Sequence, residues 1–357
     1  MKRILAGLIV LAALVSAAAY AFRGDIALAV MTRSVARTMA ADVVGAMPDG
    51  LNVVICGSGG PMSDRDRGGP CTAVVAGKRL FIVDTGEGAG RTLGRLGVGA
   101  ADTSVLLTHF HSDHFDGLGN VVLQHWVGFN TSTPLPLYGP QGVERIAAGF
   151  NEAYAMDAGY RTAHHGEPVA PPAGAGLQAR PFVIPDGQDQ VVVLNDGGLK
   201  ITAFRVDHGP VKPAVGYRFD YKGRSVVISG DTSITATTAA QAKGADLLLH
   251  DALSPELVKL LHDSSLAADR PKRAKIFADI PNYHASPEGV ADLASKAGVK
   301  GLVLTHVVPP LPIRALEVVF RGKAGDIFKG PLWVARDGDV FSLPAGGSTI
   351  EHSKLGR

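Results

Sequence analysis

Short, mostly apolar runs separated by turn residues fill the chain after residue 50. The run Leu51–Cys56, for example, is followed by a glycine-rich segment from Gly57 to Pro61, a pattern typical of a buried β-strand. Strands and hairpins come first, then helices, then strands and helices again. This order predicts an α+β fold of four layers, an αββα sandwich in which two sheets pack face to face and helices cover the outside.

The individual elements follow from the same pattern of apolar and turn residues. The predicted strands are residues 51–56, 71–75, 80–83, 104–107, 191–194, 199–206, 214–221, 225–229, 247–249 and 302–304. The predicted helices in this region are residues 88–96, 142–158, 254–262 and 287–297.

The N-terminus has the pattern of an export segment. Lys2 and Arg3 precede an uncharged stretch from Ile4 to Phe22, and Ala19-Tyr20-Ala21 fits the small-x-small pattern of signal cleavage sites. Residues 1–22 therefore predict a cleaved signal peptide or an uncleaved membrane anchor. Both interpretations export the rest of the chain, either to the periplasm or anchored with its large domain outside the cytoplasm. A buried first helix of a cytoplasmic protein is the remaining alternative.

Three further segments complete the predicted organisation. Residues 23–50 are expected to form a lead-in amphipathic helix over Asp25–Met47, which Pro48-Asp49-Gly50 ends. Residues 51–345 are expected to form one large domain, and residues 346–357 are expected to be a flexible tail.

Composition excludes only a few classes of protein and of site. Hydrophobic residues make up 46% and charged residues 19%, which supplies a large core and argues against disorder. The net charge is +2, and the lysines and arginines are scattered, so no nucleic-acid partner is expected. Two cysteines exclude an all-cysteine zinc site. Cys56 and Cys71 flank the loop between the first two strands and are either a disulfide or two buried thiols.

The strongest chemical signal is the segment Thr108–Gly117. It places His109, His111, Asp113 and His114 directly after a predicted strand. The alternating His109 and His111 can direct two nitrogens at one cation, while Asp113 and His114 at the following turn can bind a second. Imidazole and carboxylate are the donors expected for zinc and similar metals.

Four later strands end in polar residues that can bind metal. They end at His208, Asp231, His250 and His306. The rim of a sheet is a rigid place from which to present ligands, so we expect His208, Asp231 and His306 to join the histidine cluster. Asp231 is the expected bridge, because a carboxylate has two oxygens to share between two metals.

These motifs resemble the dinuclear branch of the metallo-β-lactamase superfamily. The resemblance spans Leu51–Pro310 and is closest to the arylsulfatase-like, ribonuclease Z-related group. The motifs that carry it are H-F-H-S-D-H (109–114), D-H-G-P-V-K-P-A-V-G-Y-R-F (207–219), S-G-D-T (229–232) and Y-H-x-S-P-E (283–288) ahead of L-T-H (304–306).

The resemblance implies a ligand set for two zinc ions, although Mn²⁺ or Fe²⁺ would suit the same donors. It implies one ion held by His109, His111 and His208, a second held by Asp113, His114 and His306, and Asp231 between them. Asp84 matches the family's early aspartate, which supports the histidine loop without binding metal.

The sequence departs from two branches of this superfamily. The β-lactamases proper lack the last histidine of the cluster, and many have a cysteine where Asp231 stands. Ribonuclease Z proteins carry a long tRNA-gripping arm between the positions of His208 and Asp231, where this chain has only 22 residues. We therefore do not expect β-lactam hydrolysis or tRNA processing.

The expected mechanism is attack by a metal-bridging hydroxide on an ester. Asp113 would orient the hydroxide and accept its proton, and His284 would protonate the leaving group. Ser286 and Pro287 resemble a helix cap that fixes the loop of His284. His250 either supports a ligand by a hydrogen bond or orients Asp231.

Three inserted segments are expected to close the substrate pocket. These are Trp126–Pro136, Phe150–His165 and Leu253–Ile280, the first two rich in aromatic residues. Packing in the core or against a membrane is the alternative for them.

The sequence as a whole predicts an exported dinuclear zinc hydrolase that is arylsulfatase-like and cleaves a sulfate or phosphate ester of a small molecule. A phosphodiesterase of ribonuclease Z-like type, a lactonase or carboxylesterase, and a non-catalytic metal-binding protein are the alternatives. Membrane contact is expected if residues 1–22 are retained, and a homodimer is left open.

Overall fold

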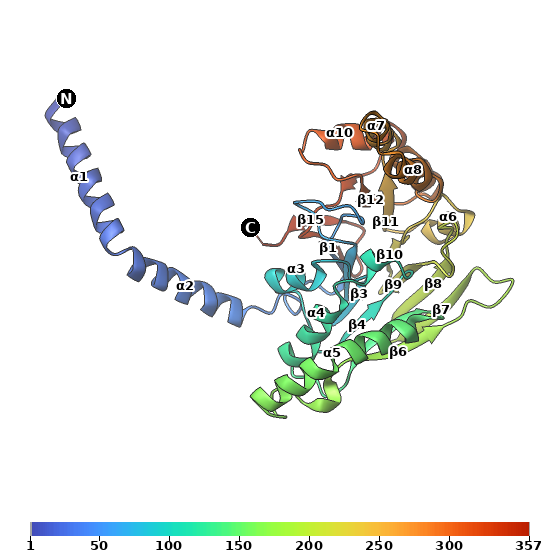
Figure 1. Cartoon of the computed structure of the whole chain (residues 1–357), viewed down its shortest axis with the longest axis horizontal. Coiled ribbons are helices and arrows are strands. Elements are labelled where there is room, and N and C mark those ends of the chain that lie inside the picture. The colour runs from blue at the N-terminus through green and yellow to red at the C-terminus, as the bar shows by residue number, and fades with distance from the viewer. Residues whose placement is uncertain (1, 357) are drawn as a thin grey trace. The chain divides into compact units, whose positions relative to one another are not determined.

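The computed structural model describes residues 2–356 and divides into two units, the first ending at Val43 and the second beginning at Val44 (Figure 1). The first unit consists of two helices, α1 (Lys2–Ala21) and α2 (Arg23–Ala40). By length and composition alone, α1 could cross a membrane, a test that signal sequences also pass. The helix predicted over Asp25–Met47 ends earlier, at Ala40, because the chain enters the second unit, where Val44 is buried.

The first sheet of the second unit has eight strands in the order β15-β14-β1-β2-β3-β4-β5-β6. The run from β3 to β6 is parallel, whereas the other neighbours pair antiparallel. The strands are β1 (Gly50–Gly57), β2 (Cys71–Ala76), β3 (Arg79–Val83), β4 (Thr103–Leu106), β5 (Leu135–Pro140), β6 (Leu177–Phe182), β14 (Asp339–Pro344) and β15 (Glu351–Lys354).

The second sheet has seven strands in the order β13-β12-β11-β10-β9-β8-β7. Here the run from β10 to β13 is parallel and the run from β7 to β10 is antiparallel. The strands are β7 (Gln190–Asp196), β8 (Leu199–Arg205), β9 (Val215–Tyr221), β10 (Arg224–Ile228), β11 (Leu247–Leu253), β12 (Gly301–Val308) and β13 (Leu332–Val334).

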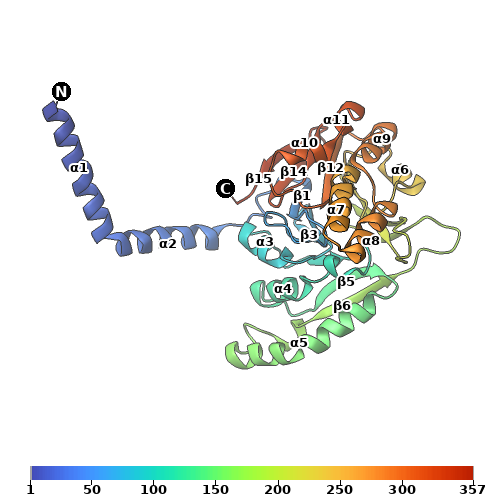
Figure 2. The same ribbon diagram turned by 45° about the horizontal axis from the view of Figure 1, so that its top comes forward.

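Helices cover the outer faces of both sheets, α3 to α5 on the first and α6, α9, α10 and α11 on the second (Figure 2). The helices are α3 (Ala89–Leu96), α4 (Leu118–Leu123), α5 (Val143–His165), α6 (Ala236–Ala242), α7 (Pro255–Ala267), α8 (Pro271–Asp279), α9 (Pro287–Ala297), α10 (Leu316–Arg321) and α11 (Ala324–Ile327). Shorter turns are η1 (Ser112–His114), η2 (Gln124–Gly128), η3 (Pro172–Gly174) and η4 (Ile280–Asn282).

The core between the sheets explains why the strands lie face to face. Val53 of β1, Phe81 of β3 and Phe219 of β9 are buried together in one apolar cluster, and the rings of Phe81 and Phe219 are 6.1 Å apart. Burial of side chains from both inner faces is what holds a sandwich together. The predicted αββα architecture is therefore confirmed.

Two open points of the sequence are resolved by the fold. Cys56 and Cys71 form a disulfide between β1 and β2, which leaves no free cysteine in the described residues. The tail predicted to be flexible differs, because Glu351–Lys354 form β15 and pair with β14. Backbone hydrogen bonds to a neighbouring strand require no apolar pattern, so the polar sequence of this strand gave no signal.

Candidate metal centre

The histidine loop leaves β4 and is held in place by Asp84, which follows β3. Thr108 donates hydrogen bonds to the Asp84 carboxylate from its backbone N–H and from its hydroxyl, each over 2.8 Å. The other contact of Asp84 is His114, whose Nδ1 lies 2.8 Å from Oδ2. Asp84 has a positive φ of 59°, an uncommon conformation for a residue with a side chain. The structure thus places Asp84 where the sequence predicts it, beneath the loop.

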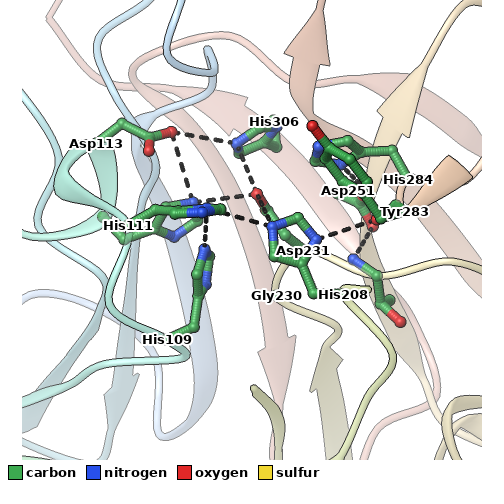
Figure 3. Close-up of polar contacts among 12 residues, drawn as sticks. His109, His111, Asp113, His208, Gly230, Asp231, Asp251, Tyr283, His284 and His306 are labelled. Atoms are coloured by element: carbon green, nitrogen blue, oxygen red, sulfur yellow. Dashed lines mark hydrogen bonds and ion pairs between the residues drawn. The ribbon is translucent and has the colours of Figure 1, made fainter. Parts of the chain in front are cut away.

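Three imidazoles form the first group of donors. Nε2 of His109 lies 3.0 Å from Nδ1 of His111, and Nε2 of His208 lies 3.3 Å from the same atom (Figure 3). The three rings come from two distant segments, the loop after β4 and the residues after β8. Their nitrogens lie within 4.8 Å of one another, which is compact enough for one ion.

A second group contains one carboxylate and two imidazoles. Oδ2 of Asp113 lies 3.6 Å from Nε2 of His114 and 3.5 Å from Nε2 of His306. His306 lies near the end of β12 and has a positive φ of 46°. Such backbone conformations often occur at functional sites.

Asp231 lies between the two groups, three residues after the end of β10 (Figure 3). Its Oδ2 is 3.3 Å from Nε2 of His114, 3.1 Å from Nε2 of His306 and 3.9 Å from Nε2 of His208. One carboxylate therefore faces donors of both groups, as the sequence predicts for a bridge.

Unsatisfied polar atoms show that this cluster fits metal ions. Asp113 Oδ2, His114 Nε2 and both ring nitrogens of His306 are buried without a hydrogen-bond partner among residues 2–356. Buried polar atoms normally have partners, because leaving them unpaired costs free energy. Converging nitrogen and carboxylate donors of this kind match the coordination chemistry of zinc and related divalent metals.

The imidazoles of the first group are held neutral. Burial lowers the pKa of His109 well below its usual value, and the nearby His114 lowers it further. Burial also lowers the pKa of His111 and of His208. A neutral imidazole offers a free lone pair, which is the form that binds metal.

In the second group the nearby carboxylates determine the direction of the histidine pKa shifts. Burial lowers the pKa of His114, but Asp231 and Asp84 outweigh burial and hold that pKa well above its usual value. Burial likewise opposes protonation of His306, yet Asp231 again outweighs it and raises the pKa. These carboxylates favour positive charge at the point where a cation would replace the protons.

The predicted proton donor His284 lies beside the cluster and has a partner that the sequence prediction missed. Nδ1 of His284 lies 2.8 Å from Oδ2 of Asp251. The other oxygen of Asp251 lies 3.0 Å from Nδ1 of His250. His250 therefore contacts Asp251 and not Asp231, which narrows its predicted role. In the sequence Asp251 directly follows His250 at the end of an apolar run, and nothing in the spacing favours one of the two.

The residues around His284 also orient His208. The backbone carbonyl of Tyr283 accepts a hydrogen bond from Nδ1 of His208 over 3.1 Å, which leaves Nε2 of that ring facing the donor group. Ser286 caps α9 by accepting from the N–H of Gly289 over 3.1 Å, as predicted for this loop.

The aromatic segments lie elsewhere than predicted. Trp126 is buried and its indole N–H donates to the carbonyl of Pro171 over 2.7 Å. With Phe150 and Tyr154 it lines a separate cavity of about 240 Å³, and no candidate metal ligand lines that cavity. These side chains pack between α4 and α5. The aromatic residues of these segments therefore serve packing and do not close the pocket of the metal centre.

A different loop opens onto the metal centre. Residues 60–69 line a cavity of about 580 Å³ that reaches Asp113 and Asp116. The predicted segment Leu253–Ile280 forms the α7–α8 hairpin and supports this loop, because Met62 packs against Val258 and Phe277. The sequence gave no apolar or aromatic signal for residues 60–69.

Comparisons with known proteins extend these observations. A family described as "Beta-lactamase superfamily domain" matches residues 79–307. The protein "Ribonuclease Z" of Mycobacterium avium (strain 104) is 38% identical over 290 residues, which cover 80% of this chain and 96% of that protein. "Ribonuclease Z" of Mycobacterium sp. (strain KMS) is 35% identical over 280 residues, 78% of this chain and 91% of the relative.

Solved structures share the fold at low identity. Human tRNase Z, short form, aligns with a TM-score of 0.58 and 21% identity over 82% of this chain and 99% of its own. The metallo-beta-lactamase fold protein YhfI from Bacillus subtilis aligns with a TM-score of 0.57 and 20% identity, covering 83% and 100% of the two chains.

Proposed function

Because this chain belongs to the beta-lactamase superfamily, in its ribonuclease Z-related branch, we propose that this metal-dependent hydrolase is a phosphodiesterase that cleaves RNA. The single observation that carries the proposal is the 38% identity to a ribonuclease Z of which 96% is covered. The site supports it, since it can hold two cations beside a group that donates protons.

Two expectations from the sequence are wrong. The relatives are ribonucleases, which overturns the arylsulfatase-like hydrolase of small esters and the statement that no nucleic acid is bound. The error came from the missing arm between His208 and Asp231. Lack of an arm removes one means of gripping RNA, but it leaves the chemistry of phosphodiester cleavage unchanged.

The proposed ligands are the two donor groups and the carboxylate between them. His109, His111 and His208 would hold one zinc ion. Asp113, His114 and His306 would hold the other, and Asp231 would contact both. Zinc is proposed because imidazole and carboxylate suit it, although Mn²⁺ and Fe²⁺ accept the same donors. Such ions acidify water and polarise a phosphoryl oxygen when bound.

The chain's own residues would handle the protons. Asp113 has an oxygen without a hydrogen-bond partner in the described residues and can accept a proton from the attacking water. His284 presents Nε2 to the site while Nδ1 is held by Asp251, so its ring can deliver a proton to the departing ribose oxygen. The Asp251 carboxylate fixes the orientation of the ring for this transfer.

The test is a panel of substrates given to the purified, metal-loaded protein. It contains a precursor tRNA, a short single-stranded RNA, an aryl sulfate, a lactone and a β-lactam. The proposal expects cleavage of at least one RNA with loss of activity after chelation and recovery on adding Zn²⁺. Turnover of the aryl sulfate or the lactone with both RNAs intact would overturn it.

We also propose that residues 1–22 export the protein or anchor it in the membrane. The support is the apolar helix α1, preceded by Lys2 and Arg3 and ending in a small-x-small segment. This proposal concerns location alone and is independent of the chemistry.

A further inference from the structure

A groove of about 730 Å³ lies at the carboxyl ends of β5 and β6, outside the metal centre. Three segments line it, at residues 140–142 and 144–145, at 182–184 and 186, and at 205–206 and 212–215, and we call it the β5–β6 groove. The start of α5 forms one wall and the connection between β8 and β9 forms the other. None of the groups discussed for the reaction uses this space.

The topology places the groove next to the metal-binding loop. Strands β4, β5 and β6 are parallel neighbours, so their carboxyl ends meet at one edge of the sheet (Figure 2). His109 follows β4 at this edge, while the groove segments follow β5 and β6. The groove wall and the metal-binding loop are close together. A Cβ added to Gly142 in the groove wall would lie only 3.0 Å from the ring of Phe110 in that loop.

The opposite wall is continuous with a candidate ligand. His208 forms a β-bridge with Val211, and Lys212 follows directly. Lys212 therefore extends from a short closed loop that begins at His208. Both walls are thus tied to segments that carry donors of the first metal group.

Both walls present free positive charge. Arg145 and Lys212 are exposed, and neither has an ion pair or a side-chain hydrogen bond among residues 2–356. Arg205 is different, since its guanidinium donates to the carbonyls of Ile184 and Gln188 and so stabilises the adjoining loop. The carboxylate of Glu144 accepts a hydrogen bond from the backbone N–H of Gly142, so it faces the neighbouring backbone.

The floor of the groove is apolar. Phe182 is half-buried, Ile184 is buried, and Val183 is 59% exposed. An apolar floor between cationic walls suits a single strand of nucleic acid, whose bases need apolar contact and whose phosphates need positive charge. A small anion would use the charges alone and leave the floor uncovered.

We propose that the β5–β6 groove binds the single-stranded part of the RNA next to the scissile phosphate, with Arg145 and Lys212 contacting backbone phosphates. The inference rests on the proposed function and adds to it the path of the substrate. It also explains how a chain without the long arm between His208 and Asp231 can hold RNA. Contacts to phosphate position a nucleic acid without reading its sequence, so the groove would accept varied sequences.

The test compares Arg145→Ala/Lys212→Ala with Lys243→Ala/Lys329→Ala. The control removes two exposed cations that have no ion pair in the described chain and do not line the groove. Both pairs are made in a His284→Ala background, metal-loaded, so that cleavage is slow during the measurement. The probe is a fluorescein-labelled oligouridylate, and its dissociation constant is measured at several salt concentrations.

Loss of two phosphate contacts should reduce the slope of log K against log salt by about 1.4, which weakens binding on the order of 20-fold at 0.1 M salt. In the control variant, neither the salt slope nor the dissociation constant should change by more than about one third as much as in the groove variant. Equal effects of the two pairs would overturn the inference.

A second measurement guards against damage to the metal centre. With His284 intact, the groove variant should lose several-fold more kcat/KM for RNA than for bis(4-nitrophenyl) phosphate, which is too short to lie along the groove. Equal losses with both substrates, or loss of metal, would mean that Arg145 and Lys212 only support the fold. If the unmodified protein neither binds nor cleaves RNA, the proposed function fails, and that result is distinct from failure of the groove alone.

Discussion

At the scale of single residues, Asp231 is the group on which both metals are predicted to depend. Its Oδ2 lies within 3.3 Å of imidazole nitrogens from His114 and His306 and reaches toward His208. Asp231→Ala should lower the metal content from about two per chain to one or less, because a shared ligand is lost and the two cations then repel each other unscreened.

Elemental analysis of the purified protein after zinc reconstitution measures this content. Asp263→Ala, which removes an exposed carboxylate on α7, should leave it unchanged. If the unmodified protein binds less than one metal per chain under the same conditions, the dinuclear site is not there to be disrupted.

His284 is predicted to donate a proton rather than to bind metal. Its Nδ1 is occupied by Asp251, which leaves only one nitrogen for chemistry. His284→Ala should retain metal but slow RNA cleavage by about 10²–10⁴-fold, the usual contribution of a general acid. The loss should be smaller for nitrophenyl phosphodiesters, whose leaving groups depart readily as anions.

A series of leaving groups with rising pKa measures this dependence, with His165→Ala on the exposed end of α5 as the control. A loss of the same size across the series would assign His284 a supporting role in the site.

Asp251 is predicted to act through His284. Asp251→Ala removes the acceptor that orients the ring, so RNA cleavage should again fall. The double variant Asp251→Ala/His284→Ala should then be no slower than His284→Ala alone, because residues that act as one unit are not additive. Independent, multiplying losses in kcat would separate the two roles.

The sequence predicted which side chains gather at the candidate metal centre, because motif spacing and strand ends determine where they lie. Three histidines and a carboxylate in one loop, with later polar residues at strand ends, converge whenever those strands meet at one edge. Asp251 could not be singled out in this way. It adjoins His250 on β11, and successive strand residues point to opposite faces, so the choice between them depends on register.

At the scale of elements, the disulfide fixes the loop that opens onto the site. It joins Cys56 at the end of β1 to Cys71 at the start of β2, with a sequence separation of 15. Residues 60–69 lie inside this closed segment and line the cavity that reaches Asp113.

Cys56→Ala/Cys71→Ala should lower the free energy of unfolding by about 3 kcal/mol, as expected for closing a loop of this size. Denaturant unfolding followed by circular dichroism measures the change, and the reducing agent dithiothreitol should reproduce it in the unmodified protein. Unfolding that is insensitive to both treatments would show that the crosslink adds nothing to stability.

Three of the strands missed by sequence analysis, β5, β6 and β15, lack the usual pattern of a strand. Strands β5 and β6 contain Pro136, Pro140 and Pro181, and proline normally argues against a strand. β6 is the last strand of the first sheet, where a missing N–H is tolerated because one side of the strand has no partner, and β5 pairs with β4 only at Leu137 and Tyr138. Strand β15 lies at the other end and is polar throughout. In β6 and β15, the edge position therefore permits sequences that strand prediction does not recognise.

At the scale of the whole molecule, the proposed export segment would decide which RNA the protein can meet. A C-terminal reporter that is active only outside the cytoplasm should be active when fused to this chain, and a reporter active only inside should be silent. Leu11→Arg, near the middle of α1, is the matched control, since an arginine there opposes membrane insertion by about 2.5–3.5 kcal/mol. It should reverse both signals.

Activity of the cytoplasmic reporter alone would overturn export and place the enzyme with the RNA precursors of the cell interior. If export holds, mass spectrometry of the mature N-terminus distinguishes cleavage after Ala21 from retention of α1. An exported enzyme would meet RNA only outside the cytoplasm, where maturation of tRNA does not occur. The oxidising compartment would also preserve the disulfide between Cys56 and Cys71, which a reducing cytoplasm would not. The redox state of these two cysteines in the purified protein is therefore a second, independent readout of the same location.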